Sequence, residues 1–167
     1  MQETANKYFA CFEILFAARS CDLTQTSSQT FSTLVLLAAG TGITPMLQIA
    51  SSTLRNPCNK SRIVLLSFSK NDHDVCLHQD LIDLKRLSPP SFTLKFFASQ
   101  LSAANPHEGV VQGSMRALTA QMLLEHAGVP TLETTAFCMC GPSDWIAVTQ
   151  QLLKRGGVPD NHILAWT

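Results

Sequence analysis

The chain has 167 residues, which suits a single domain large enough to bury a hydrophobic core. Twelve basic residues balance twelve acidic residues, so no net field attracts nucleic acid or an anionic membrane surface. Aromatic residues make up only 7%, and no basic stripe with interleaved aromatics occurs, which argues against a nucleic-acid partner.

The cysteines and the apolar runs indicate the cellular compartment in which we expect the protein. The six cysteines have no framework spacing, which favours reduced thiols in a cytoplasmic compartment. No apolar run reaches the roughly 18 residues expected of a membrane span. The apolar stretch 8–18 is interrupted by Glu13 and lacks a basic flank and a cleavage site, so it does not read as a signal peptide.

Residues 1–30 differ from the remainder of the chain. Apolar side chains at helix-like spacing predict a short amphipathic helix near the N-terminus, formed by Tyr8, Phe9, Phe12, Leu15 and Phe16. The polar stretch 24–30 then reads as a linker. We therefore expect an atypical segment over residues 1–30 and one domain over residues 31–167.

From Phe31 onward, strand-like and helix-like segments alternate. Short apolar runs predict strands at 34–38, 63–68, 92–97, 134–140 and 162–166. Apolar stripes of helical period predict helices at 45–54, 76–87, 114–127 and 143–155. This alternation predicts an α/β fold, a doubly wound parallel sheet of five strands in the order 3-2-1-4-5 with helices on both faces.

Two turns in this pattern carry the main functional signal. Residues 40–45 (Gly-Thr-Gly-Ile-Thr-Pro) follow the first predicted strand, and residues 140–142 (Cys-Gly-Pro) follow the fourth. In a doubly wound sheet, ligands bind beyond the carboxyl ends of the strands, where the strand order reverses. The predicted order reverses between strands one and four, so both turns should flank one crevice.

The first turn has the chemistry of a phosphate-binding corner. Gly40 and Gly42 let a phosphate approach the main chain, and the following helix start offers amides and a partial positive charge. Thr41 and Thr44 add hydroxyl groups. Pro45 suits a first helical turn, but it stands where a Rossmann fingerprint has its third glycine. A tight strand-to-helix turn without a ligand is the alternative for the two glycines alone.

The longer string at residues 39–46, Ala-Gly-Thr-Gly-Ile-Thr-Pro-Met, is more specific. It resembles the nicotinamide-binding domain of the ferredoxin reductase superfamily, and within it the NADH–cytochrome b5 reductases. The Cys-Gly-Pro turn is similar to that family's second signature. The loop 69–75 resembles its loop facing the adenosine ribose, and residues 113–115 resemble its turn before the third helix. The resemblance covers about residues 31–167 and leans towards reductases fused to a cytochrome b5 domain.

The resemblance implies roles for individual residues. Thr41 and Gly42 would contact the phosphates or the nicotinamide side, Thr44 would face the flavin, and Cys140 would lie beside the nicotinamide C4 to orient hydride transfer. Asp74 would disfavour a ribose 2′-phosphate, so NADH is expected over NADPH, although Lys70 places a cation in the same loop. The expected cofactor-binding set is Gly40, Thr41, Gly42, Pro45, Lys70, Asp74, Gly113, Ser114, Cys140, Gly141 and Pro142.

These residues and their neighbours also have simpler structural explanations. Cys140 is also explained as a small buried hydrophobe. Asp72 and Asp74 are also explained as solvated loop residues or as caps of the next helix, and Trp166 is better explained by packing than by stacking on a cofactor. His73, Asp74, Cys76 and His78 crowd together, but their spacing matches no common structural zinc site, so no metal is expected.

In the family that the chain resembles, electrons pass from NADH to FAD and then to a one-electron acceptor such as cytochrome b5. An upstream barrel domain holds the FAD through an Arg-x-Tyr-Ser/Thr motif, and residues 1–30 contain no such motif. We therefore expect FAD only where another domain or a flavin-bearing partner supplies it. The alternative is a truncated, catalytically silent binding or regulatory module. The resemblance also suggests a location at the cytosolic face of the endoplasmic reticulum.

Overall fold

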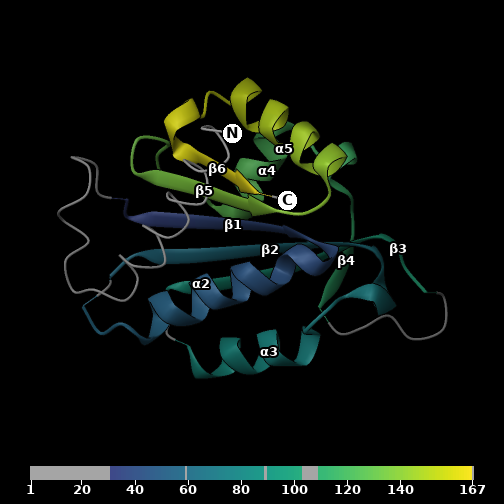
Figure 1. Cartoon of the computed structure of the whole chain (residues 1–167), viewed down its shortest axis with the longest axis horizontal. Coiled ribbons are helices and arrows are strands. Elements are labelled where there is room, and N and C mark those ends of the chain that lie inside the picture. The colour runs from purple at the N-terminus through teal and green to yellow at the C-terminus, as the bar shows by residue number, and fades with distance from the viewer. Residues whose placement is uncertain (1–30, 59, 89, 103–108, 167) are drawn as a thin grey trace, which may run out of the picture.

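Six parallel strands form one sheet in the order β4-β3-β2-β1-β5-β6 in a computed structural model that describes residues 31–58, 60–88, 90–102 and 109–166 (Figure 1). The strands are β1 Thr33–Ala39, β2 Arg62–Asn71, β3 Phe92–Gln100, β4 Val110–Gln112, β5 Thr135–Cys140 and β6 Ile163–Trp166. The predicted amphipathic helix and linker within residues 1–30 lie outside the described residues.

The central strands are apolar along their whole length because helices cover both faces of the sheet. Every residue of β1 and of β5 is buried. Strands covered on both sides need no alternation of polar and apolar residues, which explains the continuous runs in the sequence. β1 pairs with β5 from Thr33↔Thr135 to Ala38↔Cys140, so the two strands end together.

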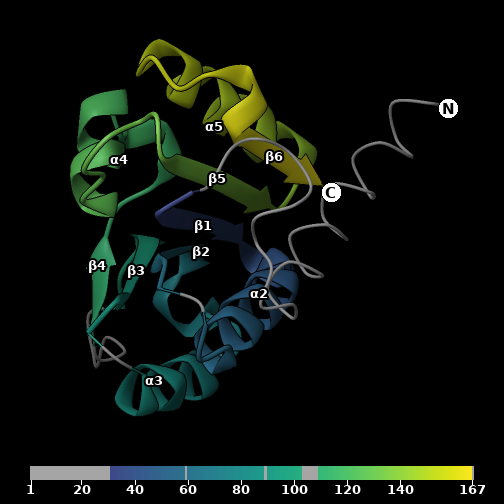
Figure 2. The ribbon, with the colours of Figure 1, turned by 90° about the vertical axis from the view of Figure 1, so that its left-hand side faces the viewer.

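The helices form two layers, as Figures 1 and 2 show from two directions. α4 and α5 cover one face of the sheet, and α2 and α3 cover the other. The helices are α2 Ile43–Arg55, α3 His78–Leu87, α4 Ala120–Ala127 and α5 Ser143–Arg155. Short 3₁₀ turns lie at η1 Gly40–Gly42, η2 Asp72–Asp74, η3 Met115–Ala117 and η4 Asp160–His162.

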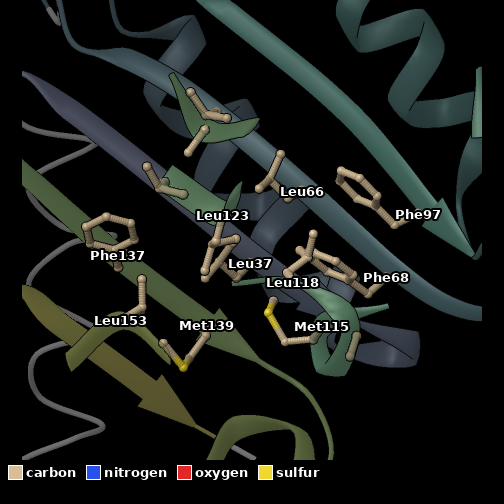
Figure 3. Packing of buried hydrophobic residues seen from close by; sticks show 14 of the residues in the cluster. Leu37, Leu66, Phe68, Phe97, Met115, Leu118, Leu123, Phe137, Met139 and Leu153 are labelled. Atoms are coloured by element: carbon tan, nitrogen blue, oxygen red, sulfur yellow. The ribbon is translucent and has the colours of Figure 1, made fainter. Parts of the chain in front are cut away.

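The hydrophobic core is split by the sheet into two clusters. The cluster under α4 and α5 contains the aromatic rings of Phe68 and Phe97, which stack with their centroids 4.9 Å apart. Figure 3 shows this cluster, in which Met115 and Leu118 reach over the sheet from the segment before α4. The cluster under α2 and α3 is built from the opposite side chains of the same strands, which follows from the alternation along a strand.

The predicted fold class is confirmed, with two corrections. The sheet has six strands rather than the predicted five, because Val110–Gln112 pairs with the edge of β3. The helix predicted from residue 114 begins only at Ala120, since the Thr119 hydroxyl caps it by accepting from the amide of Met122 at 3.2 Å. The apolar spacing of Met115 and Leu118 continues the helical pattern through a 3₁₀ turn and so hides the true helix start.

Candidate functional site

The two turns singled out in the sequence lie against one another at the carboxyl edge of the sheet. A Cβ atom added to Gly42 would lie 2.2 Å from the carbonyl oxygen of Cys140 and 2.9 Å from the amide nitrogen of Gly141. That space is too small for any side chain. Because residue 42 is glycine, the backbones of the two turns can lie in direct contact. The predicted crevice therefore has its two walls in direct contact at its base.

Gly40 has a different reason to be glycine. Its φ angle is +55°, a left-handed conformation that costs other residues about 1 kcal/mol. A Cβ atom at this position would meet no atom within 4 Å, so the backbone here faces open space. Together the two glycines shape a corner whose inner side is closed by protein and whose outer side is open to a ligand.

The start of α2 presents hydroxyl groups more than amides. Thr41 and Thr44 are exposed. The amide of Ile43 points back to the carbonyls of η1, and Pro45 has no amide hydrogen. The helix dipole still places partial positive charge at this edge. The two threonine hydroxyls are therefore exposed polar groups at the start of α2, and their contact with a phosphate stays a prediction.

The turn after β5 is anchored beneath the corner. Cys140 is only 8% exposed, and its side chain belongs to the cluster on the α2–α3 face. A Cβ atom on Gly141 would lie 2.9 Å from the Cβ of Ala39 and 3.1 Å from the ring of Trp145, so this glycine too permits close packing. The carbonyl of Pro142 accepts the Ile146 amide at 3.0 Å as α5 begins. The role of Cys140 beside a nicotinamide stays a prediction.

The loop after β2 carries the residues predicted to face the adenosine ribose. Asp74 is exposed, and its Oδ2 accepts a hydrogen bond from the side-chain amide of Asn71 at 2.5 Å. Lys70 is exposed and, by strand alternation, projects from the opposite face of β2 to Asn71. Among the described residues Lys70 forms no ion pair with either aspartate of the loop.

Gly113 and Ser114 follow β4, the edge strand on the far side of β3 and β2 from β1. The Gly113 amide donates to the Ala98 carbonyl at 2.8 Å at the end of β3. β4 stands three strands from β1, which is about 14 Å at the usual strand spacing. From Ser114 the chain turns inward, and η3 packs against α5. Gly113 and Ser114 therefore lie between the edge strand β4 and the segment that packs against α5.

Two side chains near the site were missed by sequence reasoning. Asn71 belongs to no recognised motif, although a side-chain amide three residues before an aspartate is a local pattern that favours a hydrogen bond between the two side chains. Trp145 lies beneath Gly141, with its ring centroid 5.8 Å from that of Phe68. The ring nitrogen of Trp145 is buried without a hydrogen-bond partner. Nothing in the sequence distinguished this tryptophan from an ordinary core residue at the start of a helix.

The structure also bears on metals and membranes. Across the described ranges, no group of three His, Cys, Asp or Glu side chains is placed to hold a metal ion. In that same part of the chain, no helix has the length and hydrophobicity needed to cross a bilayer. None of the four cysteines that the structure describes forms a disulfide.

Comparison with known proteins identifies the domain. The family model described as the oxidoreductase NAD-binding domain matches residues 36–151, a span that contains both turns of the crevice. The chain belongs to this family. The NAD-binding domain is 32% identical over 132 residues to NADH-cytochrome b5 reductase 1 of Cryptococcus neoformans, a match covering 75% of this chain and 43% of that protein. It is 30% identical over 127 residues to human NADH-cytochrome b5 reductase 2, covering 75% and 44% respectively.

The chain thus spans less than half the length of these curated relatives. Among solved structures, it is similar to the cytochrome b5 reductase domain of Ulva prolifera nitrate reductase, with a TM-score of 0.68 and 20% identity over 81% of this chain and 50% of that one. The CS-b5R domains of human Ncb5or in the NAD+ form give a TM-score of 0.65 and 24% identity over 82% and 37%. These structures establish the fold, and the predicted family is confirmed by the family model.

Proposed function

We propose that this NAD-binding domain serves a flavin-dependent reductase that passes electrons from NADH through FAD to a haem protein such as cytochrome b5. The observation that carries the proposal is the contact between the Gly42 and Cys140 backbones at the carboxyl edge. It forms one corner from two turns, at the place where doubly wound sheets bind dinucleotides. Bound NADH would supply a hydride, and the chain's own residues would position it.

The residues at the corner suit a pyrophosphate and a nicotinamide. Gly40 leaves its backbone open to solvent, and the hydroxyls of Thr41 and Thr44 are exposed beside it. We assign the phosphates to this turn and to the positive end of α2. Gly141 and Pro142, with Cys140, would limit the position of the nicotinamide ring, and Thr44 would face the flavin.

The loop after β2 favours NADH over NADPH. Asp74 is exposed and is not paired with Lys70, so a ribose 2′-phosphate would meet an uncompensated carboxylate. A ribose 2′-hydroxyl would instead donate a hydrogen bond to it. Lys70, Gly113 and Ser114 would complete the outer part of the cofactor site.

FAD would come from another domain or from a flavin-bearing partner, as the resemblance to these reductases implies. Such a complex would reduce cytochrome b5, and the resemblance to these reductases suggests the cytosolic face of the endoplasmic reticulum. Hydride transfer requires the flavin and the nicotinamide in near contact, so this domain by itself should bind NADH without turning it over.

Titration of the purified chain with NADH and with NADPH tests the binding part of the proposal. We expect saturable NADH binding and weaker NADPH binding by calorimetry or by quenching of tryptophan fluorescence. The absence of saturable binding of either nucleotide would remove the proposal. A visible spectrum of the same preparation should be featureless, and flavin absorbance would contradict the view that FAD is supplied from elsewhere.

Reconstitution tests the electron-transfer part. The chain is mixed with the isolated FAD domain of a related reductase, and NADH-dependent reduction of ferricyanide and of cytochrome b5 is followed. Reduction that requires both components supports the proposal. NADH binding without any reduction would favour the catalytically silent module instead.

A further inference from the structure

The loop after β2 carries two carboxylates in opposite environments. Asp74 is exposed, whereas Asp72 is 1% exposed. Oδ1 of Asp72 accepts the amide of Ser102 at 3.1 Å, which ties this loop to the chain leaving β3. Oδ2 of Asp72 is buried and has no hydrogen-bond partner among the described residues. The buried carboxylate therefore anchors the loop, and the exposed one is left for a ligand.

A second set of contacts fixes Asp74 itself. Asn71 is the last residue of β2 and is half-buried, and its side-chain amide donates to Oδ2 of Asp74 at 2.5 Å. The Asn71 carbonyl accepts from the Ser69 hydroxyl at 2.8 Å, so the donor is itself held by the strand. The Asp74 carbonyl accepts from the Cys76 thiol at 3.6 Å. Oδ1 of Asp74 has no hydrogen bond to any described residue.

We propose that Asn71 is a specificity-determining positioning residue, whose amide holds one oxygen of Asp74 so that the other faces the adenosine ribose. This inference rests on the proposed function and extends it from Asp74 to the residue that orients it. The ligand class is a dinucleotide with an unmodified adenosine ribose.

The physical reason lies in the mobility of an exposed carboxylate. An exposed aspartate side chain that turns into solvent repels a 2′-phosphate less strongly, because greater distance and screening by water both reduce the repulsion. A donor from a paired strand removes that freedom. Asn71 also supplies a neutral donor, so Asp74 keeps its full negative charge, whereas a lysine or arginine at this position would cancel it.

The charged groups around Asp74 do not take over this role. Lys70 projects from the other face of β2, and Asp72 is buried and bonded to Ser102. His73 lies between the two aspartates on η2 and is exposed. The side-chain hydrogen bond that orients the Asp74 carboxylate therefore comes from Asn71.

A double-mutant cycle on the full chain tests the proposal through one ratio, Kd(NADPH)/Kd(NADH). Asp74→Ala should lower this ratio the most. Asn71→Ala should lower it by about threefold to tenfold, the usual net worth of one hydrogen bond. The double variant should match Asp74→Ala, since Asn71 acts only through Asp74.

Gln100→Ala is the matched control, because Gln100 stands opposite Asn71 in the β2–β3 register and is exposed. It removes an amide side chain from the same part of the edge and should leave the ratio unchanged. Asn71→Leu, which keeps the size of the side chain and removes the donor, replaces Asn71→Ala if that variant does not fold. Thermal melting of each variant separates lost stability from lost selectivity.

Three results would overturn the inference. An unchanged ratio in Asn71→Ala beside a lowered ratio in Asp74→Ala would leave the proposed function standing and dismiss Asn71. An equal further drop in the double variant would show that Asn71 acts independently of Asp74. An unchanged ratio in Asp74→Ala would remove the residue through which Asn71 is proposed to act. A wild-type chain that binds neither nucleotide would fail the proposed function as well.

Discussion

The carboxyl and amino edges of the sheet differ in surface shape and in the partial charge that they present. At the carboxyl edge, two turns press their backbones together and leave exposed hydroxyls beside them. Near the amino edge, a shallow groove of about 460 Å³ lies along α4 and beside the end of α5. Its lining residues are Ala120, Gln121, Leu124, Glu125, Gly128, Val129, Arg155 and Gly156. None of these lining residues belongs to the two turns at the carboxyl edge.

The direction of the helices explains why the two edges carry opposite partial charges. α2 and α5 begin at the carboxyl edge, where unpaired amides give partial positive charge. α4 and α5 end at the amino edge, where carbonyls accumulate, and basic side chains already bind some of them. Arg62 donates to the Gly128 carbonyl, and Lys95 donates to the His126 carbonyl at 2.8 Å. An anionic pyrophosphate is favoured at the first edge and disfavoured at the second.

Gly42→Ala should have the largest effect on NADH affinity. Its Cβ would overlap the Cys140 carbonyl, so the two turns must separate. We expect NADH binding to weaken by at least about tenfold, with a loss of stability of about 1–3 kcal/mol. Gly156→Ala is the control, because its added Cβ would pack tightly against Ala120 and Leu124, away from both turns. Isothermal titration decides the point, and wild-type affinity in Gly42→Ala would contradict the proposed corner.

Thr44→Val should have a smaller effect. The change keeps the shape of an exposed side chain at the start of α2 and removes its hydroxyl. We expect NADH to bind about threefold to tenfold more weakly, which is the usual net worth of one hydrogen bond. Thr131→Val, on the loop at the amino edge, is the matched control and should bind normally. Equal affinities of both variants would exclude a phosphate contact from Thr44.

Cys140→Ser should change the reaction more than the binding. The side chain is buried in the α2–α3 cluster, so its replacement should alter the Kd for NADH by about twofold or less, because it removes no surface contact to the phosphates. In the reconstituted reductase the hydride-transfer rate should fall, and stopped-flow absorbance measures it. A variant with a lowered affinity and an unchanged rate would reverse this assignment.

Gly156→Ala should leave NADH affinity unchanged, which is the smallest effect expected. The added Cβ would lie 3.2 Å from that of Ala120 and 3.3 Å from Leu124 at the floor of the amino-edge groove. We expect a loss of stability of about 1 kcal/mol from this tight packing. Thermal melting together with titration separates the two quantities. Weakened NADH binding at unchanged stability would move the site to the groove.

The parts predicted well are those in which local pattern and tertiary environment agree. α5 was expected over residues 143–155 and spans Ser143–Arg155, because its apolar stripe ends at a glycine pair. β4 was missed, since three residues carry no usable period and Val110–Gln112 is extended only through pairing with β3. The start of α4 was misplaced because Met115 and Leu118 continue its stripe without belonging to it.

The sequence by itself determined the chemistry of the site: a glycine corner after the first strand, a Cys-Gly-Pro turn after a later one, and a carboxylate after the second. The tertiary structure decided that Gly42 touches the Cys140 carbonyl and that Asn71 holds Asp74. The reason is that side-chain type and local period act between near neighbours in the chain. Which backbone meets a bare glycine, and how an exposed carboxylate is turned, depend on strand register and on loops packed from elsewhere.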